Sequence, residues 1–386
     1  MDFKLSEEHK AVQQAAREFA KTRLLEGVIE RDSKMIHPSE QVAEMGALGF
    51  MGIMTSEKYG GSGMDALSYV LALEEISKID ASAAVIMSAH NSLALWAIEA
   101  YGSDTQKETY LTPLAQGKNI GCFCLSEPEA GSDASMQRTT AEDKGDFYLL
   151  NGVKNWITNG GKADYQLVIA QTDPDKKHRG INAFIVEKNW EGVTVGPKED
   201  KLGIRSSDTH SINYTDVKVP KQNRIGADGF GFKLAMQILE GGRIGIAAQA
   251  LGIAAGAYEL SANYSTIRSS FGKPIADHQA IAFKLAEMAM DIEAARMLVY
   301  RAAYLKDSGE PYGYASAMAK LKASDVAMKH TVEAVQIHGG NGYVKEYHVE
   351  RLMRDAKITQ IYEGTSEIHK IIIARNIRRG ELALPI

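Results

Sequence analysis

The chain has 386 residues, of which 45% are hydrophobic and 24% are charged, with 35 glycines and only 9 prolines. This length allows two or three domains, and the composition is that of a globular protein rather than a disordered one. The net charge of −5 arises from charges of both signs spread along the chain, which excludes a long basic surface for nucleic acid or for an anionic membrane. Small molecules or proteins are therefore the expected partners.

Three further absences concern the cellular location. Cys122 and Cys124 form neither a disulfide framework nor a C-x-x-C redox pair, which suggests a reducing compartment. The first residues lack the pattern of a signal peptide or of an organelle presequence, and no window reaches the roughly 18 uncharged apolar residues typical of a transmembrane helix. These features predict a cytoplasmic protein, although a mature mitochondrial matrix protein would have the same pattern.

Residues 1–120 are predicted to form a helical domain. Ser6 is placed to cap the first helix, and the apolar positions after it recur at spacings of four and three: Val12, Ala16 and Phe19. The segments DALSYVLALEEISKI and LALWAIEAYG continue the helical pattern, and Gly102 is placed to end the second of them.

Residues 121–225 have a different pattern, with short runs rich in Val, Ile, Tyr and Trp that are separated by turn residues, which predicts a β domain. From 226 to 386 the helical pattern returns. One helix of this part has apolar positions in unbroken steps of four and three: Ile281, Leu285, Met288, Ile292, Ala295, Val299 and Ala302. Helices of this length predict a bundle, and the order of helices, strands and helices disfavours a doubly wound α/β sheet.

Several common functional motifs are missing. The sequence has no G-x-G-x-x-G after a strand and no P-loop, so neither a Rossmann site nor a P-loop nucleotide site is supported. It has no H-E-x-x-H and no Cys/His cluster, so no metal site is expected, and it has no G-x-S-x-G elbow of a serine hydrolase.

Glu363 is the first candidate for a catalytic group. It lies in the segment IYEGTSEI, just before a helix that is expected to take Thr365 or Ser366 as its N-cap and to end near Gly380. A carboxylate in such a loop can point into a cleft, and Gly364 would let a ligand approach the backbone closely. Most acidic residues in loops are simply exposed, so the pattern alone leaves both interpretations open.

Three other segments could contact a ligand. The turn FCLSEPEAGSD offers Ser126, Ser132 and several backbone amides to a polar group, Trp156 and Thr158 share one face of a strand, and QIHGGNGY is rich in glycine at a helix end. An ordinary strand exit, a half-buried tryptophan and a helix C-terminal turn would look similar.

Taken together, these segments resemble the acyl-CoA dehydrogenase family over essentially the whole chain. The resemblance is carried, in the family's order and spacing, by SEPEAGSD, WITNGG, KEDKLGIRSS, RSSFGKPIADHQ, QIHGGNGY and RLMRDAKITQIYEGTSEI. It is closest to the short-chain, butyryl-CoA type, through KEDKLGIR, GFKLAMQILEGGRIGIAAQALGIA and YEGTSEI. The resemblance implies an N-terminal helical domain, a middle β-barrel or sandwich domain and a C-terminal four-helix bundle. It also implies non-covalently bound FAD and a homotetramer.

By the same resemblance, Glu363 is the base of a step in fatty-acid β-oxidation. It would take the α proton of an acyl thioester while the β carbon gives a hydride to flavin N5, and trans-2-enoyl-CoA would leave. The enolate-like oxygen needs fixed donors, which in the family are the backbone N–H of the base and a ribityl hydroxyl of FAD. Isovaleryl-type relatives place the base just before the arginine that matches Arg243, where this chain has Gly242.

The resemblance also assigns binding residues. It places around the flavin ring Phe123, Leu125, Ser126, Trp156, Ile157 and Thr158, with Ser132, Thr365 and Glu367 near the same cofactor. It places at the pyrophosphate and adenine end, partly across a subunit boundary, Arg268, Phe271, Gln279, Gln336, Gly339 and Gly340. It places on the CoA side Ser132, Glu240 and Arg243, with Gly364 against the thioester.

Four positions depart from the family pattern. Glu240 replaces an aspartate and Glu129 a small residue, and both are expected to adjust the CoA side. His338 replaces an apolar residue and His348 a proline, which leaves the local packing open.

The substrate follows less directly from the resemblance. Leu95 and Trp96 would shorten the acyl pocket to about four carbons if they pointed inward, whereas a Trp96 packed in the helical core would leave the pocket deeper. The resemblance therefore implies a short-chain acyl-CoA dehydrogenase that passes electrons to electron-transferring flavoprotein. The alternatives are a branched-chain or cyclic acyl-CoA substrate and, as a different class, a flavin-binding paralog without turnover, some of which bind DNA through a basic surface that this acidic chain lacks.

Overall fold

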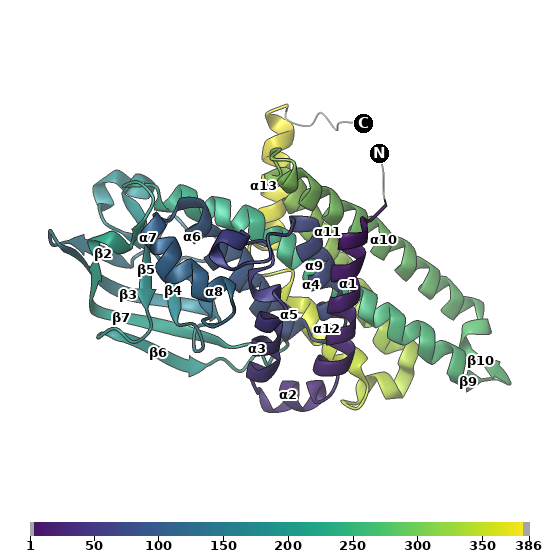
Figure 1. The fold of residues 1–386 in the computed structure, drawn as a ribbon. Coiled ribbons are helices and arrows are strands. Elements are labelled where there is room, and N and C mark those ends of the chain that lie inside the picture. Colours follow the sequence, from purple (N-terminus) through teal and green to yellow (C-terminus); the bar gives the residue numbers. More distant parts are fainter. Residues whose placement is uncertain (1–3, 381–386) are drawn as a thin grey trace.

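The computed structural model describes residues 4–380, which form a helical N-terminal part, a central sheet and a C-terminal helix bundle (Figure 1). The N-terminal part consists of α1 (Glu7–Phe19), η1 (Ala20–Leu24), α2 (Val28–Lys34), α3 (Ser39–Ala47), η2 (Phe50–Gly52), η3 (Glu57–Tyr59), α4 (Ala66–Ile79), α5 (Ala81–Ser88), η4 (Ala89–Leu95), α6 (Trp96–Tyr101), α7 (Asp104–Gln106), η5 (Lys107–Leu111) and α8 (Thr112–Ala115). Ser6 caps α1 by accepting the backbone N–H of His9 at 3.1 Å, and α6 ends at Gly102, as the sequence predicts.

The middle part is built from β1 (Gly121–Cys124), β2 (Thr140–Asp143), β3 (Phe147–Thr158), β4 (Tyr165–Gln171), η6 (Pro174–Gly180), β5 (Ile181–Glu187), β6 (Val193–Lys198), β7 (Thr209–Pro220), η7 (Lys221–Asn223) and β8 (Arg224–Ile225). The strands run in the order β6-β7-β3-β2-β4-β5-β8, and β1 pairs with β4 in parallel. The long antiparallel pair β3–β7 contains a register shift between Lys154 and Ile157, where Trp156 has a left-handed backbone with φ of 62°. This bulge places Trp156 and Thr158 at the end of the sheet next to the helical parts.

The C-terminal part begins with α9 (Gly231–Ile267), a helix of 37 residues, followed by the hairpin β9 (Ser269–Ser270) and β10 (Lys273–Pro274). It continues through η8 (Ile275–Asp277), α10 (Gln279–Asp307), α11 (Gly313–His338), η9 (Gly339–Tyr343), α12 (His348–Ile358) and α13 (Ser366–Arg378). Helices α9, α10, α11 and α12 form the four-helix bundle, which confirms the fold class. In α10 the expected apolar positions from Met288 to Ala302 are buried, whereas Ile281 and Leu285 near the hairpin are only partly covered.

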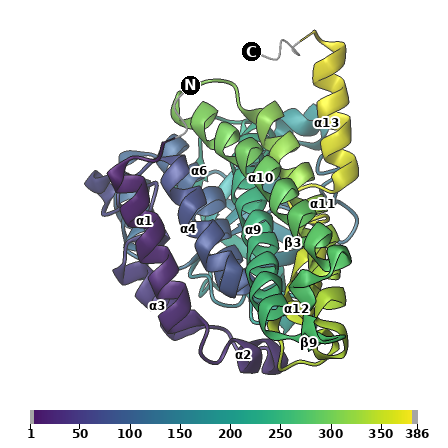
Figure 2. The ribbon, with the colours of Figure 1, turned by 90° about the vertical axis from the view of Figure 1, so that its right-hand side faces the viewer.

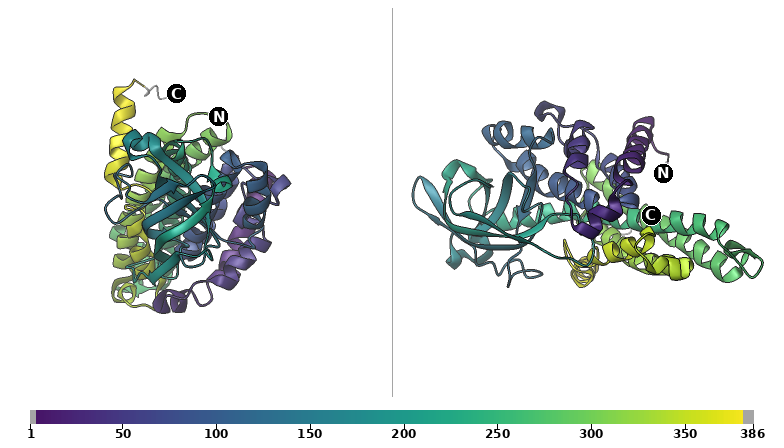
Figure 3. Two further views of the ribbon diagram at one scale, coloured as in Figure 1. Left: turned by 90° about the vertical axis from the view of Figure 1, so that its left-hand side faces the viewer. Right: turned by 90° about the horizontal axis from the view of Figure 1, so that it is seen from below.

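The N-terminal helices and the bundle share one hydrophobic core. It runs from Val12 in α1 through Leu73 in α4 and Leu251 in α9 to Ala319 in α11. Figure 2 shows α1, α4, α9 and α11 as successive layers, and Figure 3 shows the sheet at one end of an elongated molecule with the hairpin β9–β10 at the other. The centre of the molecule is therefore where all three parts can contribute side chains to one site.

Two helical stretches are long and apolar enough to cross a membrane by length and composition. They are Ala81–Tyr101 and α9, and 94% and 83% of their apolar windows are buried inside the fold. The sequence-based expectation that no stretch has the length and composition of a membrane span was therefore wrong. These two stretches are apolar on all sides because other elements of the fold surround them.

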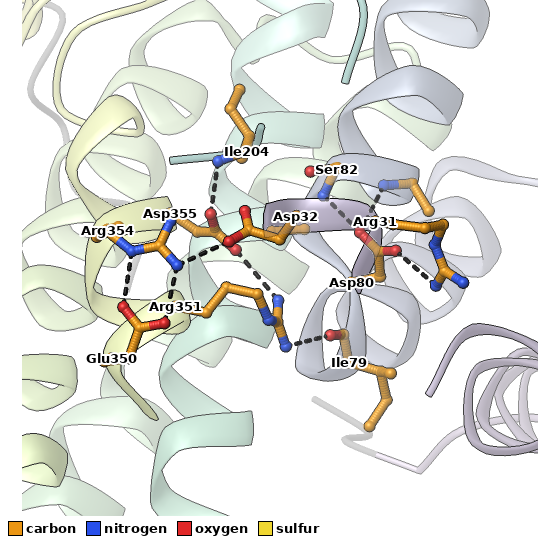
Figure 4. A network of polar contacts seen from close by, with 12 residues as sticks. Arg31, Asp32, Ile79, Asp80, Ser82, Ile204, Glu350, Arg351, Arg354 and Asp355 are labelled. Carbon is orange, nitrogen blue, oxygen red and sulfur yellow. Dashed lines mark hydrogen bonds and ion pairs between the residues drawn. The ribbon is translucent and has the colours of Figure 1, made fainter. Parts of the chain in front are cut away.

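A buried polar network fixes the three parts relative to one another (Figure 4). Asp355 of α12 accepts the backbone N–H of Ile204, in the loop before β7, at 2.5 Å, and pairs with Arg351 at 3.2 Å. Arg354 of α12 reaches Asp32 of α2 at 2.7 Å. Because β7 pairs with the bulged end of β3, this network sets the position of Trp156 and Thr158 relative to the segment that follows α12.

Candidate active site

Glu363 lies in the short loop between α12 and α13, outside the helix that follows it. Thr365 is the N-cap of α13 and accepts the backbone N–H of Ile368 at 3.4 Å, and the helix ends before Gly380, as predicted. Glu363 has φ of 51° and Gly364 has φ of 101°, so two successive residues adopt the left-handed region. A non-glycine residue in this region is held there by its surroundings, and such residues concentrate at functional sites.

The Glu363 carboxylate is buried. Its Oε2 atom has no hydrogen-bond partner among residues 4–380, although other atoms of the residue keep some exposure. A Cβ atom at Gly242 of α9 would lie 2.2 Å from this oxygen and 2.7 Å from Leu93 Cδ2. The carboxylate therefore points onto the α9 backbone and not into solvent, and the solvated-loop interpretation is wrong.

Burial raises the pKa of Glu363 to about 7, while the charges of Lys320 and Arg243 oppose the rise. At neutral pH such a carboxylate is divided between its acid and base forms, which is the range in which general bases work best. Arg243 is itself buried, and its Nε atom has no partner among the described residues. This combination of a burial-shifted acid and unpaired polar atoms is typical of a catalytic site.

Several groups at this site were missed by the sequence analysis. Lys320 of α11 is fully buried and donates to the Gly364 carbonyl at 2.6 Å, and the Tyr362 hydroxyl donates to Gln249 of α9. His369 of α13 is buried against Gly364, and neither ring nitrogen has a partner among residues 4–380. The sequence contains one indication that Lys320 is buried. In YASAMAKLKAS it lies among small residues that share one helix face.

The residues of the sheet that were expected to contact the flavin differ in how far their side chains are exposed. Trp156 is 61% exposed at the bulge, and Phe123, Ser126 and Thr158 are partly exposed, whereas Leu125 is 8% exposed. Ile157 is 2% exposed and packs into the core of the sheet, so its backbone and not its side chain is available to a ligand. Thr365 is the N-cap of α13 and Glu367 lies in its first turn, and Ser132 is exposed in the loop after β1.

The residues expected at the adenine end lie far along the bundle. Arg268, Phe271 and Gln279 surround the hairpin β9–β10, and Phe271 is 95% exposed. Gln336, Gly339 and Gly340 are brought to the same end because His338 stacks on Tyr264 with ring centroids 4.2 Å apart. This stack explains the histidine at 338, while His348 occupies the first position of α12, where proline is also favoured. Along α9, Arg268 is about 37 Å from Arg243 at 1.5 Å per residue, so one chain does not bring the two sets together.

On the CoA side, Glu240 is partly buried next to Gly313, where a Cβ would lie 2.9 Å from the carboxylate, and burial raises the pKa of Glu240. Glu129 forms an ion pair with Arg138 in the exposed loop after β1. Trp96 packs edge-on against Tyr101 at 6.0 Å, and Leu95 is buried in the helical core. Leu93 of η4 is the residue that approaches Gly242, where a Cβ atom would also meet Glu363.

Comparison with known proteins shows which family the chain belongs to. Three family models match nearly the whole chain: acyl-CoA dehydrogenase N-terminal domain over residues 6–118, middle domain over 122–217 and C-terminal domain over 229–378. The chain belongs to the acyl-CoA dehydrogenase family. The protein is therefore an oxidoreductase, an acyl-CoA dehydrogenase by family.

Individual relatives are similar over their full lengths. The dehydrogenase is 50% identical to a short-chain specific acyl-CoA dehydrogenase of Clostridium acetobutylicum over 98% of this chain and 100% of the relative. It superposes on butyryl-CoA dehydrogenase from Megasphaera elsdenii with a TM-score of 0.97, at 50% identity, covering 98% and 100% of the two chains. A structure solved in work on the electron-transferring flavoprotein of Acidaminococcus fermentans and its electron bifurcation matches equally, with a TM-score of 0.97, 50% identity, and coverage of 98% and 100%.

The residues of this site fit FAD. Trp156 presents an exposed aromatic surface next to the hydroxyl of Thr158, and the buried Ser366 Oγ at the N-terminus of α13 has no partner among the described residues. At the other end, a Cβ atom at Gly339 or Gly340 would meet nothing within 4 Å, so the backbone there is open to a ligand. Planar and polar surfaces of this kind suit a ring system joined to a pyrophosphate.

Proposed function

We propose that this dehydrogenase converts a short-chain acyl-CoA, with butyryl-CoA as the preferred substrate, into trans-2-enoyl-CoA with FAD as its cofactor. The observation that carries the proposal is the buried Oε2 atom of the Glu363 carboxylate, which has no hydrogen-bond partner among residues 4–380 and lies beside Gly242 and Leu93. The similarity to short-chain specific and butyryl-CoA dehydrogenases supports the choice of substrate.

Glu363 would remove the α proton of the thioester as the ionised base. Because its pKa is raised to about 7, it is a stronger base than an ordinary carboxylate and still ionises at neutral pH. The backbone N–H of Glu363 makes no hydrogen bond within residues 4–380 and is free to donate to the thioester carbonyl oxygen, where charge develops. The substrate thus loses a proton to Glu363 and a hydride from its β carbon.

FAD would lie against Trp156, Thr158, Leu125 and the first turn of α13, and it would supply the hydride acceptor. Ile157 would contribute its backbone there. Arg243 and Glu240 would face the CoA side with Ser132. Leu93 would limit the acyl chain, since it is the apolar side chain closest to Gly242.

Electron-transferring flavoprotein would receive the electrons. The structural match from work on the flavoprotein of Acidaminococcus fermentans supports this partner. A homotetramer is proposed because the residues of the adenine end lie about 37 Å along α9 from Arg243 and would serve a neighbouring copy. A cytoplasmic location is proposed because the chain is similar to bacterial relatives over nearly its whole length.

An anaerobic titration with butyryl-CoA, followed by flavin absorbance, tests the proposal. Bleaching is expected in the wild type and is expected to be lost in Glu363→Gln, which keeps the shape of the side chain and retains FAD. If both proteins bleach alike, Glu363 is not the base. A series that includes isobutyryl-CoA and hexanoyl-CoA tests chain length, and highest efficiency on a branched chain would favour the branched-chain alternative.

A further inference from the structure

Lys320 has no evident structural reason to be buried. It lies on α11 between Ser316 and Ser324, which face the same way, and its side chain is 0% exposed. Among residues 4–380 it forms no ion pair, and its ammonium group has one hydrogen-bond acceptor, the Gly364 carbonyl oxygen at 2.6 Å. An isolated ammonium group is costly to remove from water, so a buried lysine without a carboxylate partner calls for a function.

The acceptor is the carbonyl group of the Gly364–Thr365 peptide, which lies on the C-terminal side of Glu363. Both Glu363 and Gly364 have positive φ, a backbone conformation that a glutamate adopts only where neighbouring groups fix it. The Thr365 side chain already serves as the N-cap of α13. The Lys320 bond therefore fixes the Gly364–Thr365 peptide and, together with the Thr365 cap, restrains the backbone on the C-terminal side of Glu363.

The charge of Lys320 also acts on Glu363. The charged groups that act on the carboxylate are Lys320 from α11 and Arg243 from α9, and the hydroxyls of Tyr69 from α4 and of Tyr362 interact with its charge. The groups that act on Lys320 through their charge are Glu363, Arg243, Asp325 and Glu367, and Lys320 in turn acts on His369 of α13. His369 is neutral because burial lowers its pKa to about 3, so the cations near Glu363 are Lys320 and Arg243. Burial lowers the pKa of Lys320 to about 7, while the negative charge of Glu363 opposes this fall.

We infer that Lys320 is a positioning residue for the proton transfer, which clamps the Gly364 carbonyl and supplies positive charge that favours the ionised form of Glu363. This inference rests on the proposed function. A lysine that only anchored the loop would affect the rate equally at every pH. A lysine that also supports ionisation sets the pH at which Glu363 becomes a base.

The test is the rate of flavin reduction by butyryl-CoA in rapid mixing, measured from about pH 6 to about pH 9. The variants are Lys320→Met, which removes donor and charge, and Lys320→Gln, which keeps an N–H donor without the charge. Lys322→Met is the matched control, because Lys322 lies on the same helix with a side chain that is 42% exposed. FAD content and melting temperature are recorded for each protein, and Lys320→Gln serves alone if Lys320→Met does not fold.

In the wild type the rate is expected to rise with pH through the pKa of Glu363, because only the ionised form accepts the proton. In both Lys320 variants this pKa is expected to move upward by about one unit, which lowers the rate roughly fivefold at about pH 7 and nearly tenfold at about pH 6. Lys320→Met is expected to lose up to about 100-fold in addition at high pH, because the carboxylate is no longer held in place. Lys322→Met is expected to follow the wild type.

Two results would overturn the inference. One is a Lys320→Met profile that superimposes on the wild type, and the other is a loss of rate that is uniform with pH and leaves the pKa where it was. The proposed function fails separately, since a wild-type protein that holds FAD but is reduced by no acyl-CoA would contradict that proposal before any variant is compared.

Discussion

Gly242 has no Cβ atom, and this leaves room for the Glu363 carboxylate. Any larger side chain on this turn of α9 would begin with a Cβ atom 2.2 Å from Oε2, well inside contact distance. Glycine in a helix interior lowers helix stability by about 1 kcal/mol relative to alanine. The glycine is thus explained by the space that the base needs and not by the needs of the helix.

Gly242→Ala is expected to lower the rate of substrate-dependent flavin reduction by about 100-fold, because the added methyl group displaces the carboxylate from its reacting position. The melting temperature should change little, since the gain in helix propensity is opposed by the close contact of the new Cβ atom with Glu363 and Leu93. The measurement is steady-state turnover with an artificial electron acceptor, with FAD content checked by absorbance.

Gly241→Ala is the control for this substitution. Its Cβ atom would meet nothing closer than 3.8 Å, so it makes the same change in helix propensity without touching Glu363. Equal rates for the two alanine variants would contradict the geometry described for Gly242.

Sequence reasoning located Glu363 but could not establish its burial. The loop position follows from local signals, namely Thr365 as a cap and Gly380 beyond the helix end. The burial depends on Gly242 and Lys320, which are 121 and 43 residues away in the chain and reach the loop only through helix packing. Nothing local distinguishes Lys320 from an exposed lysine except its place among small residues on one helix face.

At the level of elements, regular periodicity predicted the helices and strands well and their irregularities poorly. The apolar steps of α1 and α10 appear as buried faces. The π-helical segment η4 was not predicted, and Leu93 within it, not Leu95 or Trp96, is the side chain that approaches Gly242 and Glu363. The bulge at Trp156 likewise has no single-residue signature, because it depends on the register of β3 against β7.

Asp355→Ala is expected to destabilise the protein by about 3 kcal/mol, which corresponds to a fall in melting temperature of roughly 5 °C. The substitution leaves the buried Arg351 without its carboxylate and the backbone N–H of Ile204 without its acceptor. Thermal unfolding of the FAD-bound protein measures the effect.

The comparison variant is Asp200→Ala, which removes an ion pair with Arg205 at 2.7 Å from the same loop region. Because Asp200 is 72% exposed, this loss is expected to cost less than about 1 kcal/mol. Similar melting temperatures for the two variants would show that the network of α12 contributes no more than an exposed pair.

At the scale of the whole molecule, the order of helices, sheet and helices was predictable because composition changes sharply along the chain. The relative placement of the three parts was not, since it depends on a shared core and on buried charges contributed by distant segments. Large apolar side chains of the bundle part are exposed, namely Ile267 at 73%, Phe271 at 95% and Tyr343 at 86%, and exposed apolar side chains of this size are typical of protein contacts when they gather in a patch.

Phe271→Asp is expected to shift the protein to smaller assemblies and to weaken FAD retention, because Phe271 lies where the proposed neighbouring copy would bind. Aspartate tolerates the left-handed backbone of this position, so the hairpin itself should persist. Size-exclusion chromatography with light scattering and the flavin-to-protein ratio are the measurements.

Leu48→Asp provides the reference, since Leu48 is 52% exposed on the N-terminal part, away from the hairpin. An unchanged assembly and full FAD content in Phe271→Asp would place the subunit contact elsewhere.

The continuous helix α9 between Arg243 and Arg268 also limits which mutations, insertions and deletions this part of the chain can accept. Each residue added to or removed from a helix turns everything beyond it by about 100° and moves it by about 1.5 Å. One inserted residue between these arginines would therefore rotate the hairpin and its exposed phenylalanine away from any fixed neighbour. This stretch can vary by substitution, while insertions and deletions are expected to be tolerated only in loops such as the one between α10 and α11.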